Sequence, residues 1–176
     1  MEALILSKAV ETKDLPLETM IATNSQAILR YCHLLLRDYH EAQDVVQTTF
    51  LKAYTKRNQI KGELSPWLYR TAYNNCIDIL RRRKKQSFLD DEKREPSYHM
   101  DDGMSMEVKT ALGVLSPEER ALVINRVMDE MSYEQLSQIY NASPQALRKR
   151  YERAKKKLAD ALRSQFFGTN KGGIVT

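Results

Sequence analysis

Four helix-start signals constrain the fold of this chain more than any other feature of its sequence. A serine followed by proline, or by glutamate or glutamine three residues on, favours a helix N-terminus, because the hydroxyl accepts an unpaired backbone N–H and proline lacks one. These signals begin at Ser65, Ser116, Ser132 and Ser143. Apolar residues recur around them at helical spacing, and neither strand-period alternation nor an internal repeat stands out. The sequence therefore predicts an all-α chain.

Three helices are expected before residue 87. Two of them are amphipathic, with apolar stripes formed by Ile28, Leu29, Cys32 and Leu35 or Leu36 and by Ala42, Val45, Val46, Thr49, Phe50 and Ala53. The third is a long helix with Ser65 as its N-cap and Pro66 at its first position, followed by a run over 67–83 that contains no helix breaker.

Three further helices are expected in the C-terminal half. One runs over 117–129 from the capping box at Ser116. The next begins at Ser132, and its predicted buried residues are Leu136, Ile139 and Tyr140. A short turn over 141–144 leads to the last helix, whose predicted buried face comprises Leu147, Tyr151, Ala154 and Leu158.

The net charge of +5 hides a strong segregation of charge along the chain. A basic run occupies 81–85 and a second basic cluster occupies 148–157, whereas the stretch between the two halves is acidic and contains Pro96 and Gly103. We therefore expect two small helical domains joined by a flexible acidic linker over 87–105, each burying a modest core of its own.

The sequence offers no sign of catalytic chemistry. Cys32 and Cys76 have no metal-ligand spacing and are expected to be reduced core thiols. His33, His40 and His99 also lack such spacing, and no glycine-rich phosphate loop or nucleophile motif exists. We expect no enzymatic activity, no cofactor and no metal. No signal peptide or membrane-spanning run is evident, so we expect a soluble, cytoplasmic protein without membrane insertion.

The last two predicted helices have the pattern of a DNA-binding helix-turn-helix. If the apolar face of the second helix is buried, its opposite face can reach the major groove, where arginine pairs with guanine and glutamine with adenine. The residues expected on this face are Gln145, Arg148, Lys149, Glu152, Arg153 and Lys156. The alternative is a solvated basic surface, but the cluster nearly lacks the alternating acids of such surfaces.

Three segments resemble extracytoplasmic-function sigma factors, a family of bacterial transcription initiation factors. WLYRTAYNNCIDILRR at 67–82 closely resembles the family's −10 recognition helix. EAQDVVQTTFLKAY at 41–54 is similar to its core-polymerase-binding helix, and ALRKRYERA at 146–154 is similar to its −35 recognition helix. The resemblance covers about 24–163.

The resemblance implies a division of the chain into two sigma domains. Sigma region 2, a helical bundle, would occupy 24–86 and sigma region 4, the helix-turn-helix, 106–165, joined by the linker at 87–105. Residues 1–23 would be an N-terminal extension and 166–176 a disordered tail. The implied function is to bind core RNA polymerase and direct promoter-specific initiation, by recognising and melting the −10 element and reading the −35 element.

The resemblance also assigns site residues. The expected polymerase-binding residues are Asp44, Gln47, Thr48 and Leu51, where Thr48 replaces the usual glutamate. The expected −10 contacts are Gln59, Ile60, Lys61, Gly62, Arg70, Asn74, Asp78, Arg81 and Arg82. The first four form a loop that would capture a flipped base, with Ile60 where an aromatic is often found.

Two interpretations of the aromatics that precede the basic run remain open. Trp67, Tyr69 and Tyr73 could stack on melted bases, which suits single-stranded DNA. They could instead belong to the core, and for Trp67 and Leu68 the core interpretation is favoured.

The partners implied are promoter DNA and core RNA polymerase, through the clamp helices of its largest subunit and the flap of its second-largest subunit. Many members of the family are held inactive by an anti-sigma factor, and no residue here decides whether this chain has one. The alternative function is a helix-turn-helix repressor whose N-terminal half is a sensor or dimerisation bundle.

Overall fold

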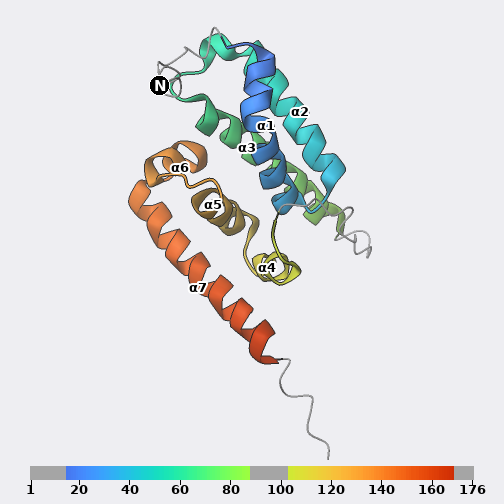
Figure 1. Ribbon diagram of the computed structural model, residues 1–176, viewed down its shortest axis with the longest axis vertical. Helices are drawn as coiled ribbons and strands as arrows, with labels where there is room; N and C mark the ends of the chain where they lie inside the picture. The colour runs from blue at the N-terminus through green and yellow to red at the C-terminus, as the bar shows by residue number, and fades with distance from the viewer. Residues whose placement is uncertain (1–14, 88–102, 169–176) are drawn as a thin grey trace, which may run out of the picture.

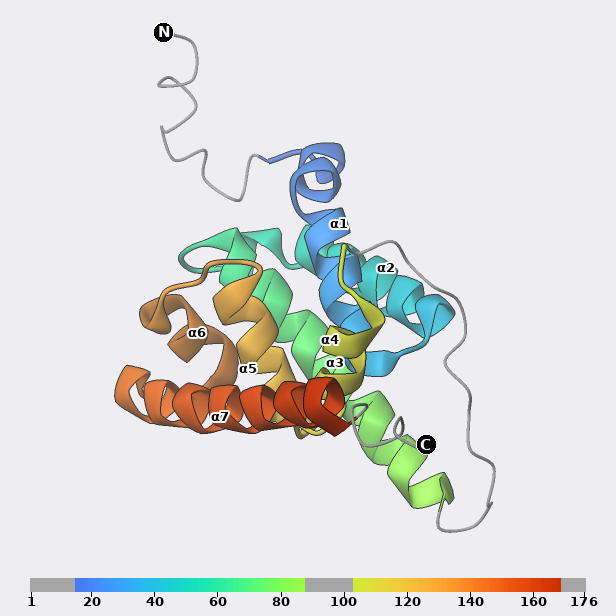
Figure 2. The ribbon, with the colours of Figure 1, turned by 60° about the horizontal axis from the view of Figure 1, so that its bottom comes forward.

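The computed structural model describes residues 15–87 and 103–168, and every regular element in these ranges is helical, as predicted. The elements are α1 (Leu17–Leu36), α2 (Tyr39–Thr55), the short 3-10 helix η2 (Arg57–Gln59), α3 (Leu64–Ser87), α4 (Met106–Leu112), α5 (Pro117–Val127), α6 (Tyr133–Tyr140) and α7 (Pro144–Gly168). Figure 1 shows α1, α2 and α3 packed together as the N-terminal part, with α4 to α7 as the C-terminal part. Figure 2 shows α5 and α6 between α3 and α7.

Some expected segments lie outside the described residues. These are positions 88–102 of the acidic linker, 1–14 of the N-terminal extension and 169–176 of the tail. The expected domain boundaries at residues 24 and 165 differ from the observed helix ends. Helix α1 already begins at Leu17, and α7 continues to Gly168. Met20, which lies in the segment assigned to the extension, is fully buried, so burial of its side chain fixes the first turns of α1.

A tight corner joins α1 to α2. Arg37 ends α1 in the left-handed conformation, with φ of 54°, and its N–H donates to the carbonyl of His33 at 2.8 Å. Asp38 then caps α2, because its carboxylate accepts the N–H of Glu41 at 3.0 Å. The Arg83 side chain of α3 closes this corner by donating to Glu41 and to the carbonyl of Leu36.

The start of α3 differs from its prediction. The helix begins at Leu64, so Ser65 lies inside the first turn and is not the N-cap. Proline is compatible with any position of a first helical turn, because no N–H there has an intrahelical partner. Pro66 therefore marks the first turn of α3 correctly but does not mark its first residue.

The three C-terminal start signals are confirmed as caps. Ser116 and Glu119 exchange both bonds of a capping box at the start of α5, at 3.2 and 3.0 Å. Ser132 and Gln135 do the same for α6 at the same two distances. At α7, the hydroxyl of Ser143 accepts the N–H of Ala146 at 3.2 Å. These local bonds fix the turn between α6 and α7.

Helix α4 was not predicted from the sequence. It has only 7 residues and is capped by Ser105, whose hydroxyl accepts the N–H of Val108. A helix of two turns is too short to reveal an apolar period in the sequence. Its buried residues are Ala111 and Leu112, and Leu112 packs in an apolar cluster with Leu115, Val123 and Ala154.

The two expected helical parts are present, and the C-terminal part buries a small apolar cluster of its own formed by Leu112, Leu115, Val123 and Ala154, but most of the core is shared between the two parts. One continuous apolar cluster includes Tyr31 and Leu68 of the N-terminal part together with Leu122, Leu136 and Leu147 of the C-terminal part. Helix α3 packs against α6, and α1 packs against α5. Neither part has enough helices to cover all of its own apolar surface. Each part therefore buries the remaining apolar surface against the other part.

Because the core is shared, a cavity in the C-terminal part should weaken the N-terminal part. Leu136 is fully buried in the shared cluster, and Leu136→Ala should lower the free energy of unfolding by about 2–5 kcal/mol. Trp67 is the single tryptophan and lies in α3, so its fluorescence reports unfolding of the N-terminal part.

We expect Leu136→Ala to shift the urea midpoint followed by Trp67 fluorescence as far as the midpoint followed by circular dichroism. Leu162→Ala, in the half-buried distal portion of α7, is the matched control and should shift both midpoints much less. A Trp67 transition that Leu136→Ala leaves in place would contradict a shared core.

Candidate nucleic-acid interface

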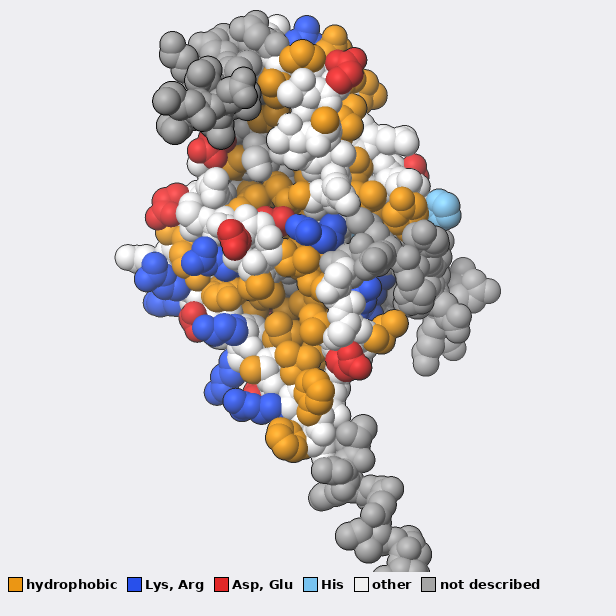
Figure 3. All heavy atoms as spheres, viewed as in Figure 1, with side chains coloured by type: hydrophobic (Ala, Val, Ile, Leu, Met, Phe, Trp, Pro, Cys, Tyr) orange, Lys and Arg blue, Asp and Glu red, His pale blue; other side chains and the backbone are white. Residues whose placement is uncertain are grey.

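Helix α7 has one buried face and one exposed basic face. Leu147 and Ala154 are buried, and Tyr151 and Leu158 are half-buried, so the face predicted to pack does so. All six predicted contacts on the opposite face are exposed: Gln145, Arg148, Lys149, Glu152, Arg153 and Lys156. Figure 3 shows Lys and Arg side chains gathered along the outer edge of α7. This arrangement leaves the face free for a phosphate backbone or the edges of bases.

Contacts with neighbours orient several of these side chains. The guanidinium of Arg148 lies 5.2 Å from the ring centre of Tyr133, the first residue of α6, within the range of a cation–π interaction. Glu152 accepts from Lys155 at 2.8 Å, and this hydrogen bond raises the pKa of Lys155. Since both partners are about half exposed, the pair adds little to stability and can break when DNA binds.

An ion pair ties α7 to the start of α5. The ammonium of Lys157 donates to the carboxylate of Glu119 at 2.6 Å, and the other oxygen of Glu119 accepts the N–H of Ser116 in the capping box. The hydrogen bond from Lys157 is the largest cause that lowers the pKa of Glu119. One carboxylate therefore both caps α5 and holds the basic helix against it.

The outer face of α3 carries the residues predicted to contact the −10 element. The exposed members are Arg70, Asn74, Asp78, Arg81 and Arg82, whose spacing puts them near one helical face. Asp78, Arg81 and Arg82 line a shallow hollow of about 390 Å³ together with Lys85. The basic run at 81–85 therefore does not lie on a single face of α3. Its member Arg83 points instead to the corner between α1 and α2.

The loop before α3 exposes three of the four residues predicted to contact the −10 element. Gln59, Lys61 and Gly62 are exposed, and Gly62 has φ of 83°, a conformation that favours glycine. Ile60 is the correction, since its side chain is only 7% exposed and belongs to the shared core. In this conformation Ile60 anchors the loop and does not offer a surface to a base.

The aromatics of α3 pack as core residues in this conformation. Tyr69 is 3% exposed and meets Tyr31 edge to face at 5.2 Å between ring centres. Tyr73 meets Tyr140 of α6 in the same manner at 4.8 Å. Trp67 is half-buried against the core, as favoured from the sequence. These contacts support the core interpretation of the aromatics.

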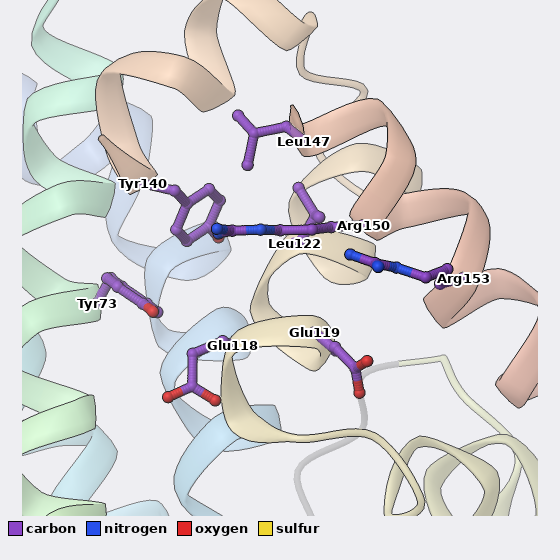
Figure 4. A pocket seen from close by; sticks show the side chains of 8 residues that line it. All are labelled: Tyr73, Glu118, Glu119, Leu122, Tyr140, Leu147, Arg150 and Arg153. Carbon is purple, nitrogen blue, oxygen red and sulfur yellow. The ribbon is translucent and has the colours of Figure 1, made fainter. Parts of the chain in front are cut away.

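A cavity between the two parts was not foreseen. It has a volume of about 360 Å³, and Figure 4 shows Arg150 of α7 reaching toward Tyr140, with Arg153, one of the six exposed residues named above, also lining the cavity. Arg150 was absent from the predicted site. Arg150 is exposed, and its position three residues after buried Leu147 and four before buried Ala154 places it beside the packed face of α7.

A third exposed surface lies on α2. Asp44, Gln47, Thr48 and Leu51, the predicted polymerase contacts, are all exposed, and Leu51 is 62% exposed despite being apolar. Tyr54, which was not predicted from the sequence, is also exposed and extends this surface, because it follows Leu51 by three residues on the same helix. The guanidinium of Arg57 lies 4.4 Å from the centre of the Tyr54 ring. An exposed apolar strip on a helix is typical of a protein-binding surface.

Other kinds of site find no support in the described residues. They contain no group of three or more His, Cys, Asp or Glu side chains that could hold a metal ion. Within 15–87 and 103–168, no helix is long and apolar enough to cross a membrane. Cys32 and Cys76 are buried free cysteines, and burial raises the pKa of Cys32 well above that of an exposed thiol.

Comparison with known families gives two matches, and both are to regions of sigma-70 factors. Residues 20–86 match the family model for sigma-70 region 2, and residues 105–158 match the model for sigma-70 region 4. The two matches correspond to the N-terminal and C-terminal parts of the fold.

Curated relatives agree with these matches. The chain is 26% identical over 157 residues to the ECF RNA polymerase sigma factor SigE of Mycolicibacterium smegmatis, an alignment that covers 82% of this chain and 61% of that protein. It is 27% identical over 155 residues to the ECF RNA polymerase sigma factor SigW of Bacillus subtilis, covering 77% and 83% of the two chains.

A solved structure shares the fold. The sigma factor RpoE from Bartonella quintana, determined with the anti-sigma factor NepR, superimposes with a TM-score of 0.71 and 24% identity, covering 83% of this chain and 96% of that one.

The pair of Lys157 with Glu119 predicts a pH-dependent stability. The pKa of Glu119 is lowered in the folded state, so its charge stabilises the fold above the pKa of an unfolded glutamate. That contribution is lost as the pH falls through the lowered pKa. Glu119→Gln should therefore lower the melting temperature at pH 7, by less than the equivalent of about 1 kcal/mol because the pair is partly exposed.

Melting curves over a pH series should show the difference between wild type and Glu119→Gln disappearing in acid. In a Lys157→Gln background, Glu119→Gln should have little effect, since the partner is already gone. If Glu119→Gln lowered the melting temperature equally in both backgrounds, the pair of Lys157 with Glu119 could not be the cause of the pH dependence.

Proposed function

Because this chain belongs to the sigma-70 family, in its extracytoplasmic-function group, we propose that it binds core RNA polymerase and directs initiation at a specific set of promoters. Sigma factors are regulatory rather than catalytic proteins, and bond formation in RNA synthesis belongs to the polymerase. The chain then acts in the cytoplasm, where polymerase and promoter DNA meet.

The observation that supports this proposal best is the exposed face of α7. A capped turn fixes α7 relative to α6, the apolar face of α7 is buried, and its basic face is open. We assign the −35 element to this face. Arg148 and Arg153 have the donors that guanine accepts, whereas Lys149 and Lys156 contact phosphates.

The −10 element is assigned to the outer face of α3 and the loop before it. Arg70, Asn74 and Arg81 lie along one exposed face, and Gln59 and Lys61 flank the buried anchor Ile60. Cations along this face follow the phosphates of a melted strand, and the exposed polar groups of the loop contact an extruded base.

The α2 surface is assigned to the polymerase. Asp44 and Gln47 supply polar contacts, and Leu51 supplies exposed apolar area at the same face. The relative from Bartonella quintana is bound by an anti-sigma factor, and we propose that a partner of this class regulates the present chain by covering the same surfaces. The repressor alternative has no supporting observation, since it requires a sensor or dimerisation bundle where residues 20–86 match sigma-70 region 2.

The polymerase assignment predicts the outcome of a run-off experiment. With bacterial core polymerase and a promoter library, the wild-type protein should create new start sites. The variant Asp44→Arg/Gln47→Ala should lose roughly tenfold or more of this activity, because a reversed charge in an interface costs several kcal/mol. The matched control is Glu18→Arg/Gln26→Ala, which makes the same changes at exposed positions of α1 and should retain the starts. Binding of a palindrome without any change in start sites would favour a repressor.

The −35 assignment predicts a graded loss of DNA binding. Arg148→Ala should weaken binding to a −35 duplex by about 1–3 kcal/mol and relax the preference at one base pair. Arg163→Ala removes another exposed arginine, from the distal end of α7, and should have little effect. Fluorescence anisotropy at fixed salt measures both variants. Equal losses of binding for the two variants would mean that the basic face of α7 attracts DNA without reading its sequence.

A further inference from the structure

The ring of Tyr133, the first residue of α6, has two guanidiniums beside it. That of Arg126 lies 4.8 Å from the ring centre, and that of Arg148 lies 5.2 Å from it. Both distances are within the range of a cation–π interaction. Arg126 belongs to α5 and Arg148 to α7, so one aromatic side chain connects three helices at the surface assigned to the −35 element.

Other contacts hold the ring in place. Tyr133 is half-buried against the apolar core, and its ring meets that of Tyr151 edge to face at 6.5 Å between ring centres. Arg126 is also held, because it donates to the carbonyl of Met131 at 2.8 Å. A ring with packed neighbours gives Arg148 a support whose position is set by the fold.

The ring orients Arg148 and leaves its donors free. Arg148 is exposed, and within 15–87 and 103–168 its guanidinium makes neither a hydrogen bond nor an ion pair. A ring contact supplies no oxygen acceptor, so the N–H groups of Arg148 stay available to the two major-groove acceptors of guanine. The contact therefore does not compete with a base.

Orientation of this side chain bears on which base is read. A free arginine samples many rotamers, and bidentate pairing with a base requires one of them. A freely moving Arg148 also reaches neighbouring bases and phosphates, since these accept the same donors. Holding the guanidinium at the ring before DNA arrives limits it to one base-pair position and lowers the ordering required on binding.

We propose that Tyr133 is a positioning residue for recognition of the −35 element. Its ring directs Arg148 at one base pair and sets the preference there, not the general attraction to DNA. The contact of the ring with Arg148 rests on the geometry alone, whereas its role in promoter selection rests on the function proposed above.

The first experiment measures base preference by run-off transcription with core polymerase on promoters whose −35 element is randomised. The base pair read by Arg148 is the one at which Arg148→Ala removes the preference. Tyr133→Leu should lower the preference at this base pair roughly twofold to fivefold, the loss expected for one exposed cation–π contact. The preference that depends on Arg153 should stay unchanged, because among the described residues no ring meets that guanidinium.

Matched variants separate the ring from its hydroxyl and from packing. Tyr133→Phe keeps the ring and should keep the wild-type preference. Tyr39→Leu makes the same change at the half-buried first residue of α2 and should alter no preference. In an Arg148→Ala background, Tyr133→Leu should have no further effect at this base pair. If circular dichroism shows that Tyr133→Leu is unfolded, Tyr133→Met takes its place, since it removes the ring with a longer side chain.

Three outcomes of this experiment would overturn the proposal. One is an unchanged preference in Tyr133→Leu at the base pair that Arg148→Ala identifies. Another is an equal loss in Tyr133→Phe, which would mean that the hydroxyl itself contacts DNA. The third is an equal loss at every base pair of the element, which would indicate a general weakening of the fold.

The second experiment observes the contact without polymerase or DNA. In a proton–nitrogen correlation spectrum, the Nε–H signal of Arg148 is identified by its disappearance in Arg148→Lys, and a neighbouring ring shifts it away from the position of a solvated arginine. Tyr133→Leu should return the signal to that position, whereas Tyr133→Phe should not. A wild-type signal already at the solvated position would contradict the positioning role.

The two experiments distinguish failure of this proposal from failure of the proposed function. If no protein, wild type included, creates new start sites, the proposed function is wrong, and the role of Tyr133 in promoter selection is wrong with it. The spectrum then still decides whether the ring holds Arg148. If the wild type creates start sites and Tyr133→Leu shows the wild-type preferences, only the positioning role is wrong.

Discussion

Burial of apolar surface between the N-terminal and the C-terminal set of helices is the interaction on which the rest of this structure depends. Three helices cannot enclose Tyr31, Leu68 and Cys76 on every side, and the four helices of the C-terminal part cannot enclose Leu136 and Leu147. Packed together they bury all of these side chains. The hydrophobic effect has no direction, so it drives the contact but does not specify its geometry. The polar groups carried into the contact specify it, because each has to meet a partner.

Arg120 shows how a charged group is accommodated in such a contact. Its side chain is 8% exposed and donates to the carbonyls of Leu112, Leu115 and Leu35, at 3.0, 3.2 and 3.4 Å. Burial lowers its pKa to about 10, which still leaves it charged at neutral pH. One guanidinium thus satisfies the ends of α4 and α1 together, so the loop before α5 is held in place by the neighbouring part of the molecule.

The elements could be predicted from the sequence where the signal was local, and only there. The caps at Ser116, Ser132 and Ser143 act within three residues, and all three were found. Helix α4 escaped because it is shorter than the window in which a period is visible. The burial of Ile60 and the bond between Tyr31 and Tyr140, 109 positions apart, escaped because each depends on where distant helices meet. Exposure of the predicted α7, α3 and α2 residues followed from their spacing, whereas the arrangement of these faces relative to one another did not.

The division of α7 into two faces also bears on how such proteins diversify. The residues that hold the helix, such as Leu147 and Ala154, share no position with those that face outward, such as Gln145 and Lys149. A substitution on the outward face therefore leaves the packing, and most of the folding free energy, unchanged. Gene duplication followed by a few outward changes can then yield paralogues with distinct target sites and equal stability, so specificity evolves without compensating mutations in the core.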